Sequence, residues 1–194
     1  MRSAFLAGVA GVSVCVLAGA AAGQFQYDEA IDGDLTDDRT APAALSAAPG
    51  ANTVAGTVVD GDIDYFRFTV PTGFELSAIN VTNYESPDFA AFLGVQNGSE
   101  FTVDPNDPDA SLLLGYALYG PLEEGTDILP AMSTAFGAIG FTGALPEGEY
   151  SFWNQQTGPD LTTYELEFVI TLVPAPAGLA VLAGAGVLAG RRRR

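Results

Sequence analysis

Two acidic clusters near the beginning of the chain have the composition of a calcium site. The first is spread over residues 28–38, and the second occupies a predicted turn at residues 60–64. Ca²⁺ takes about six to eight oxygen ligands, mostly from carboxylates and backbone carbonyls of flexible loops. Neither cluster has the glycine and glutamate spacing of an EF-hand loop. The candidate Ca²⁺ ligands are Asp28, Glu29, Asp32, Asp34, Asp60, Asp62 and Asp64.

The same clusters also suit a purely conformational role. Asp and Gly satisfy local backbone donors and adopt turn conformations, as expected for Asp32-Gly33 and Asp60-Gly61. At the level of the sequence, both interpretations stay open.

A second candidate site centres on the only tryptophan of the chain. In a strand over residues 149–155, alternation places Tyr150 and Phe152 on one face and Trp153 and Gln155 on the other. If the first face is the core, Trp153 beside the Gln155 amide forms a platform for a sugar ring, here of an exopolysaccharide. The alternative is that Trp153 packs beneath a loop or arm, because most tryptophans are largely buried.

The side-chain inventory argues against an enzyme. The chain has no histidine and no lysine, and its one cysteine, Cys15, lies in a segment that export would remove. A Ser-His, Ser-Lys or Cys-His nucleophile cannot be assembled from the rest. A hydrolase that uses two carboxylates is the remaining alternative. The simpler interpretation of the carboxylates on predicted strands is that they occupy the alternating positions that face solvent. We therefore expect no catalytic residues; the carboxylates concerned are Glu149, Glu165 and Glu167.

The net charge limits the classes of partner that the chain can bind. The chain carries a formal charge of −17, and all 24 acidic residues lie between Arg2 and Arg191, where Arg39 and Arg67 are the only basic residues. The body without its terminal segments therefore has a charge of −22. Such a surface repels nucleic acid, whose binding depends on Lys and Arg. It attracts divalent cations and cationic partners.

Residues 1–22 have the pattern of a signal peptide. Arg2 begins it, residues 4–17 form an apolar stretch, and Ala20 and Ala22 supply the small residues that signal peptidase requires. We therefore expect export, cleavage after Ala22, and a mature chain without disulfides.

The C-terminus has three parts within residues 173–194. The motif Val173, Pro174, Ala175 and Pro176 is followed by a small-apolar stretch that ends at Gly190, and then by Arg191, Arg192, Arg193 and Arg194. An apolar helix of this length falls short of a comfortable bilayer span of about 20 residues. The arginines would stay on the cytoplasmic side of the inner membrane. We expect a transient anchor in the membrane.

Between the termini, residues 53–172 predict one all-β domain, preceded by an acidic irregular arm at residues 23–52. Short segments with period-2 patterning are separated by Gly/Pro turns, and no long helical pattern occurs, which favours an antiparallel, jelly-roll-like β-sandwich. The predicted strands cover residues 53–59, 65–70, 76–84, 89–95, 112–119, 135–142, 149–155 and 162–173.

Three of these segments resemble the bacterial pre-peptidase C-terminal domain. Its Asp-x-Asp-Tyr-Phe strand and Val-Pro-x-Gly turn look matched by residues 62–73, its Gly-x-Tyr strand by residues 148–150, and its Tyr-x-Leu strand by residues 164–166. The resemblance implies a jelly-roll-like accessory module. In some members of that family, calcium is bound where the arm meets the sandwich.

The tail is similar to PEP-CTERM sorting signals, with Ala175 in place of the usual glutamate. That resemblance implies processing by an exosortase-like enzyme and release to the cell surface or extracellular matrix. The overall expectation is an exported, non-enzymatic envelope or matrix protein. The alternative is a module that binds Ca²⁺ or exopolysaccharide.

Overall fold

The computed structural model describes residues 24–156 and 158–174. The predicted signal peptide with its cleavage site at Ala20 and Ala22 lies outside the described residues. So does the tail from Ala175 to Arg194, which includes the predicted apolar helix. Within the part of the chain that is described, no helix has the length and apolar character needed to cross a membrane.

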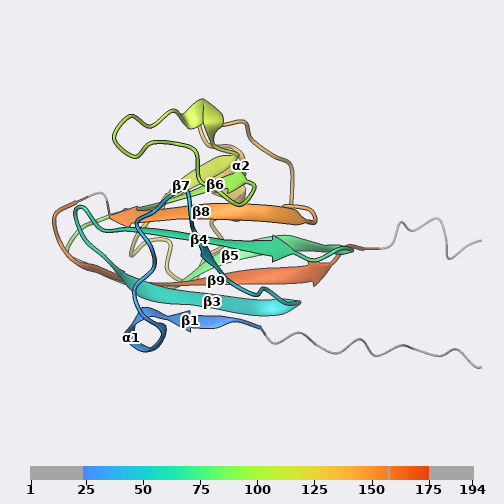
Figure 1. Cartoon of the computed structure of the whole chain (residues 1–194), viewed down its shortest axis with the longest axis horizontal. Coiled ribbons are helices and arrows are strands. Elements are labelled where there is room, and N and C mark those ends of the chain that lie inside the picture. The colour runs from blue at the N-terminus through green and yellow to red at the C-terminus, as the bar shows by residue number, and fades with distance from the viewer. Residues whose placement is uncertain (1–23, 157, 175–194) are drawn as a thin grey trace, which may run out of the picture.

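Two β-sheets pack face to face, which confirms an all-β sandwich. In the described residues their strand orders are β1-β3-β9-β5 and β2-β4-β8-β6-β7, and Figure 1 shows them as a lower and an upper layer. The strands are β1 (Gln26–Asp28), β2 (Ala43–Ala44), β3 (Gly50–Val58), β4 (Ile63–Val70), β5 (Phe74–Glu85), β6 (Ala91–Asn97), β7 (Gly115–Tyr119), β8 (Gly148–Gln156) and β9 (Thr162–Leu172). The helical segments are α1 (Glu29–Asp32), the 3₁₀ turn η1 (Ala110–Leu112) and α2 (Leu129–Ser133).

The sheets are mixed, so the expectation of purely antiparallel strands is corrected. β1 pairs in parallel with β3, and β2 pairs in parallel with β4, whereas the longer strands pair antiparallel. Both parallel strands come from residues 23–52, for which the sequence predicts an irregular arm. The arm adds one short strand to an edge of each sheet, because its backbone N–H and C=O groups need partners where they pack against the sandwich.

Residues 135–142 do not form the strand that their apolar pattern predicts. They follow α2 as a series of turns, in which Gly137 and Gly140 have φ angles of 80° and 78°. Glycine adopts this left-handed conformation without the steric cost that other residues meet, and it interrupts an extended strand. Their apolar residues therefore belong to a covering loop.

The main core lies between the sheets and is rich in aromatic rings. Phe66 and Phe68 of β4 stack on Phe152 of β8 at ring-centroid distances of 5.2 and 5.0 Å. Phe168 of β9 contacts all three rings edge-on from the opposite sheet. Burying each such side chain stabilises the fold by roughly 1.5–3 kcal/mol. The alternation of β4 that points Phe66 and Phe68 inward also points Asp64 inward.

A second apolar cluster covers the outer face of the five-stranded sheet. It consists of Tyr65, Phe101, Val103, Leu113 and Trp153. Most of the covering residues come from the long connection between β6 and β7, which crosses above β8 in Figure 1.

Candidate functional site

Three carboxylates meet where the arm closes the gap between the two sheets. Glu29 is the first residue of α1, Asp34 lies just beyond it, and Asp64 is the second residue of β4. Their candidate ligand oxygens lie within 4.8 Å of one another. Asp34 is exposed, Glu29 is half-buried and Asp64 is fully buried. We refer to these residues as the three-carboxylate cluster.

Asp64 is the unusual member of the cluster. Its Oδ2 accepts a hydrogen bond of 2.6 Å from the hydroxyl of Tyr164 on β9, whereas its buried Oδ1 has no hydrogen-bond partner among the described residues. Burial raises the pKa of Asp64 to about 9, and the Tyr164 hydrogen bond opposes this rise. The charge of Glu29 adds to the rise, and so does a proton that Asp64 and Glu29 can share. A buried carboxylate oxygen without a donor is costly, so this oxygen calls for a proton or a cation.

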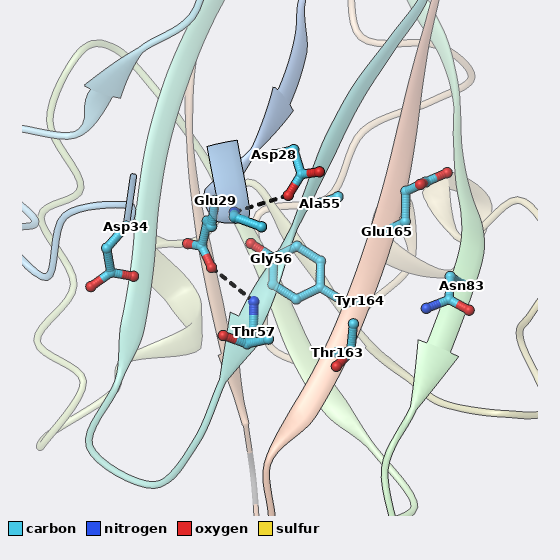
Figure 2. A pocket seen from close by; sticks show the side chains of 11 residues that line it. Asp28, Glu29, Asp34, Ala55, Gly56, Thr57, Asn83, Thr163, Tyr164 and Glu165 are labelled. Carbon is cyan, nitrogen blue, oxygen red and sulfur yellow. Dashed lines mark hydrogen bonds between the residues drawn. The ribbon is translucent and has the colours of Figure 1, made fainter. Parts of the chain in front are cut away.

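Glu29 fastens the arm to the edge of β3. Its Oε1 accepts from the Leu35 backbone N–H at 3.0 Å, and its Oε2 accepts from the Thr57 N–H at 2.8 Å, a bond drawn in Figure 2. The carboxylate lies directly over Gly56, where an added Cβ would come within 2.4 Å of Oε2. Glycine at position 56 therefore permits the close approach of Glu29 to the sheet.

Two of the predicted ligands instead shape the helical turn. Asp28 Oδ1 accepts from the Ala30 N–H at 3.0 Å as the N-cap of α1, and Asp32 Oδ2 accepts from the Asp28 N–H at 3.0 Å. Gly33 follows with a φ of 99°, and the Tyr27 hydroxyl donates to its carbonyl at 2.7 Å. The conformational interpretation of this acidic segment therefore holds for Asp28 and Asp32.

The turn between β3 and β4 contributes charge near the cluster. Burial raises the pKa of Asp62 to about 6, with further increases from Asp34, Asp37 and Glu29. Asp60 is exposed beside Gly61. Of the seven candidate ligands, the structure brings Glu29, Asp34 and Asp64 together, and Asp62 lies outside this group.

A pocket of about 480 Å³ adjoins the cluster. Figure 2 shows Glu29 and Asp34 on one side of it, and Asn83 and Glu165 on the other side across β3 and β9. Because the pocket shares two carboxylates with the cluster, an ion bound there would be accessible to solvent. The lining residues are Asp28, Glu29, Ala30, Asp34, Ala55, Gly56, Thr57, Asn83, Thr163, Tyr164 and Glu165.

The predicted sugar platform is covered. Trp153 does point away from the main core, but it is 4% exposed and packs against Tyr65, Phe92 and Phe101. Its indole N–H donates to Gln155 Oε1 at 3.0 Å. Trp153 therefore lies beneath a loop, as the alternative sequence interpretation expects, and presents little ring surface to solvent.

The strand carboxylates that a hydrolase could use are engaged across strands. Glu149 pairs with Arg67, Glu165 accepts from the Thr82 hydroxyl at 2.7 Å, and Glu167 accepts from the Asn80 amide at 2.8 Å. Arg67 and Glu149 are partly exposed, as expected for side chains on the solvent-facing side of a strand.

Two residues of the site were not singled out from the sequence. The sequence predicts only that Tyr164 lies in the strand over residues 162–173 and Gly56 in the strand over residues 53–59. In the sequence, Asp64 lies on the same alternating face as Phe66 and Phe68. This alternation predicts a buried aspartate, and a buried aspartate requires a partner.

Comparison of the chain with family models, curated proteins and solved structures gives no match. Its class is therefore defined by the fold and the site, as a β-sandwich with a partly buried carboxylate cluster under an N-terminal arm.

Proposed function

We propose that this protein is an exported β-sandwich that binds Ca²⁺ at Glu29, Asp34 and Asp64, and that the ion fastens the acidic arm to the sandwich. The observation that carries this proposal is Asp64 Oδ1, which is fully buried, has no partner among the described residues, and lies beside two other carboxylates. A bound cation replaces the proton of Asp64, compensates the charges of the carboxylates beside it, and gives Oδ1 the partner it lacks.

The ligand set favours calcium over magnesium. Ca²⁺ accepts carboxylate oxygens in a flexible coordination sphere, whereas Mg²⁺ demands near-ideal octahedral geometry and usually keeps several of its waters. The three carboxylates, whose candidate oxygens lie within 4.8 Å of one another, come from a helical turn, a loop and a strand. The adjoining pocket leaves room for the water ligands that complete the coordination of Ca²⁺.

The proposed setting is the cell envelope or extracellular matrix, and the proposed role is non-enzymatic. Support comes from the terminal segments of the sequence, from the absence of histidine and lysine, and from the strongly acidic body. Signal peptidase would remove residues 1–22, and an exosortase-like enzyme would act at residues 173–176. Mass spectrometry of the mature protein tests this processing, because a chain that still ends at Arg194 contradicts it.

A calcium titration followed by thermal melting tests the metal site in the full chain. At 100 times the Kd, binding to the native state adds about 2.7 kcal/mol, which raises the Tm by about 5–10 °C for a domain of this size. Glu29→Gln and Asp34→Asn should abolish the rise, whereas Asp60→Asn, an equal charge change at an exposed site, should retain it. Absence of any Tm change at millimolar Ca²⁺ overturns the proposal. A full response in both cluster variants places the ion elsewhere.

We do not extend the proposal to exopolysaccharide at Trp153 and Gln155, because stacking on a sugar ring requires an exposed indole face and Trp153 is 4% exposed.

A further inference from the structure

A second pocket has a different chemistry from the three-carboxylate cluster. It has a volume of about 310 Å³ and lies on the outer face of the five-stranded sheet. Its floor comes from β6, β7 and β8, and its wall comes from the connection between β6 and β7. The lining residues are Phe92, Pro105, Pro108, Ala110, Leu113, Tyr116, Trp153 and Gln155.

Three aromatic rings form most of the floor. Phe92 stacks on Tyr116 with a centroid distance of 5.8 Å and an interplanar angle of 26°, and it contacts Trp153 at 4.7 Å. Phe92 and Tyr116 are only half-buried, so this part of the aromatic cluster borders the pocket opening. Aromatic faces attract cations through the ring quadrupole.

Polar groups that could bind a sugar are few in this pocket. The Tyr116 hydroxyl already donates to the Phe136 carbonyl at 2.9 Å, and the Gln155 carbonyl oxygen accepts from Trp153. A sugar ring whose hydroxyl groups lose water without gaining partners binds poorly. The lining therefore favours a ligand with an apolar surface over a polyol.

The loop that forms the wall is acidic outside the pocket lining. Asp104, Asp107 and Asp109 are adjacent in sequence to the wall prolines Pro105 and Pro108 and are exposed. Asp104 and Asp109 accept from the backbone N–H groups of Asn106 and Ser111. The nearest described basic residue is Arg39, whose Nη1 donates to the carbonyls of Phe101 and Thr102 at 3.4 and 3.2 Å. One arginine against three carboxylates leaves the wall negative, which favours a cation over a neutral or anionic ligand.

We infer that this pocket binds a small organic cation whose charge is spread over alkyl groups, such as a trimethylammonium group. The alkyl groups would contact Phe92, Tyr116 and the wall prolines, while the positive charge would interact with the ring faces and, at longer range, with the exposed aspartates of the wall loop. This site does not depend on the proposed Ca²⁺ function, since none of its lining residues belongs to the three-carboxylate cluster.

The test uses choline and its uncharged carbon analogue 3,3-dimethylbutan-1-ol, which have nearly the same shape. Trp153 is the only tryptophan of the chain, so its fluorescence reports the site directly. Titrations are made on the full chain in EGTA, with N-acetyltryptophanamide as the control for collisional quenching. We expect choline to bind about tenfold more tightly than the alcohol. Added salt should weaken choline binding and leave alcohol binding unchanged.

Variants locate the site. Tyr116→Leu keeps apolar volume but removes a ring, and Asp107→Asn removes an exposed charge. Both should weaken choline binding several-fold, whereas Glu75→Gln on the other sheet should not. Asp107→Asn carries little risk to folding, and a melting curve checks Tyr116→Leu. Equal affinity for choline and the alcohol, no fluorescence change with choline, or a response only to sugars would each overturn the inference.

Discussion

Tyr164 on β9 and Asp64 on β4 connect the two sheets through a hydrogen bond of 2.6 Å between fully buried side chains. The bond joins the layers where the aromatic core gives way to the arm. Tyr164 holds Asp64 Oδ2 in place, so the partnerless Oδ1 remains beside Glu29 and Asp34. An apolar core does not need this aspartate for stability, which supports the binding role that we propose for Asp64.

Replacing Asp64 should change Ca²⁺ binding and the stability of the fold in opposite directions. In Asp64→Asn, the new amide can still accept from Tyr164 and can donate to Glu29 without taking up a proton. We expect the unfolding free energy in EGTA at pH 7 to rise by about 2–4 kcal/mol, because the wild-type carboxyl must take up a proton to be buried. Denaturant unfolding with and without Ca²⁺ measures both effects. The variant should lose its Ca²⁺ response, and a variant that is less stable in EGTA yet still binds Ca²⁺ contradicts the assignment.

Without metal, the unfolding free energy should fall as the pH rises, because of the raised pKa of Asp64. Its pKa is about 9 in the folded state and 3.8 ordinarily, so the folded protein binds more protons between these values. The unfolding free energy in EGTA should therefore be highest near pH 4 and fall as the pH rises through 9. Asp62, with a pKa of about 6, adds a fall of the same sign between pH 4 and 6. Urea unfolding across this range should show a much shallower slope for Asp64→Asn. An equal slope in the variant and the wild type would refute the role of Asp64.

Most of the sandwich could be predicted from the sequence, because its long strands have clear period-2 patterns. The alternating residues 162–173 form β9, whereas the apolar run at residues 135–142, for which the pattern predicts a strand, forms turns. Apolar content alone does not distinguish a strand from a loop that covers a core. The glycines at positions 137 and 140 were the better signal. The edge strands β1 and β2 could not be predicted, since their pairing depends on the finished sheets rather than on local pattern.

The candidate site could be predicted only in part. Composition identifies the acidic segments but does not predict which of their residues belong to the site. Asp28 and Asp32 form hydrogen bonds within the helical turn, whereas the folded arm places Glu29 and Asp34 in the cluster. The contribution of Asp64 depends on a contact with Tyr164 that lies 100 residues away in the chain. The alternation of residues 149–155 predicts that Trp153 faces away from the main core, but the loop that covers Trp153 has no periodic pattern from which it could be predicted.

Asn52 attaches the arm to the sandwich at the end far from the cluster. This fully buried side chain accepts from the Ala48 N–H at 3.0 Å and donates to the carbonyls of Ala48 at 2.8 Å and Phe168 at 3.2 Å. Asn52→Ala leaves these backbone groups without partners and should lower the unfolding free energy by about 2–4 kcal/mol. Asn52→Asp buries a charge and should cost more at pH 7 than at pH 4. Denaturant unfolding at both pH values measures this, and stabilities within about 0.5 kcal/mol of wild type would contradict it.

Gly56 should be required only because of Glu29. An added Cβ at position 56 would have Oε2, Cδ and Cγ of Glu29 as its three nearest neighbours, at 2.4, 2.5 and 3.0 Å. Gly56→Ala should therefore displace Glu29, lower the unfolding free energy by about 1–3 kcal/mol, and weaken Ca²⁺ binding. In a Glu29→Ala background these three nearest atoms are removed, so the same substitution should cost little, or stabilise slightly by restricting the unfolded chain. A double-mutant cycle of denaturant unfolding should give a coupling energy of about 1–3 kcal/mol. If Gly56→Ala is equally destabilising in both backgrounds, the requirement for glycine comes from the strand itself and not from the approach of the carboxylate.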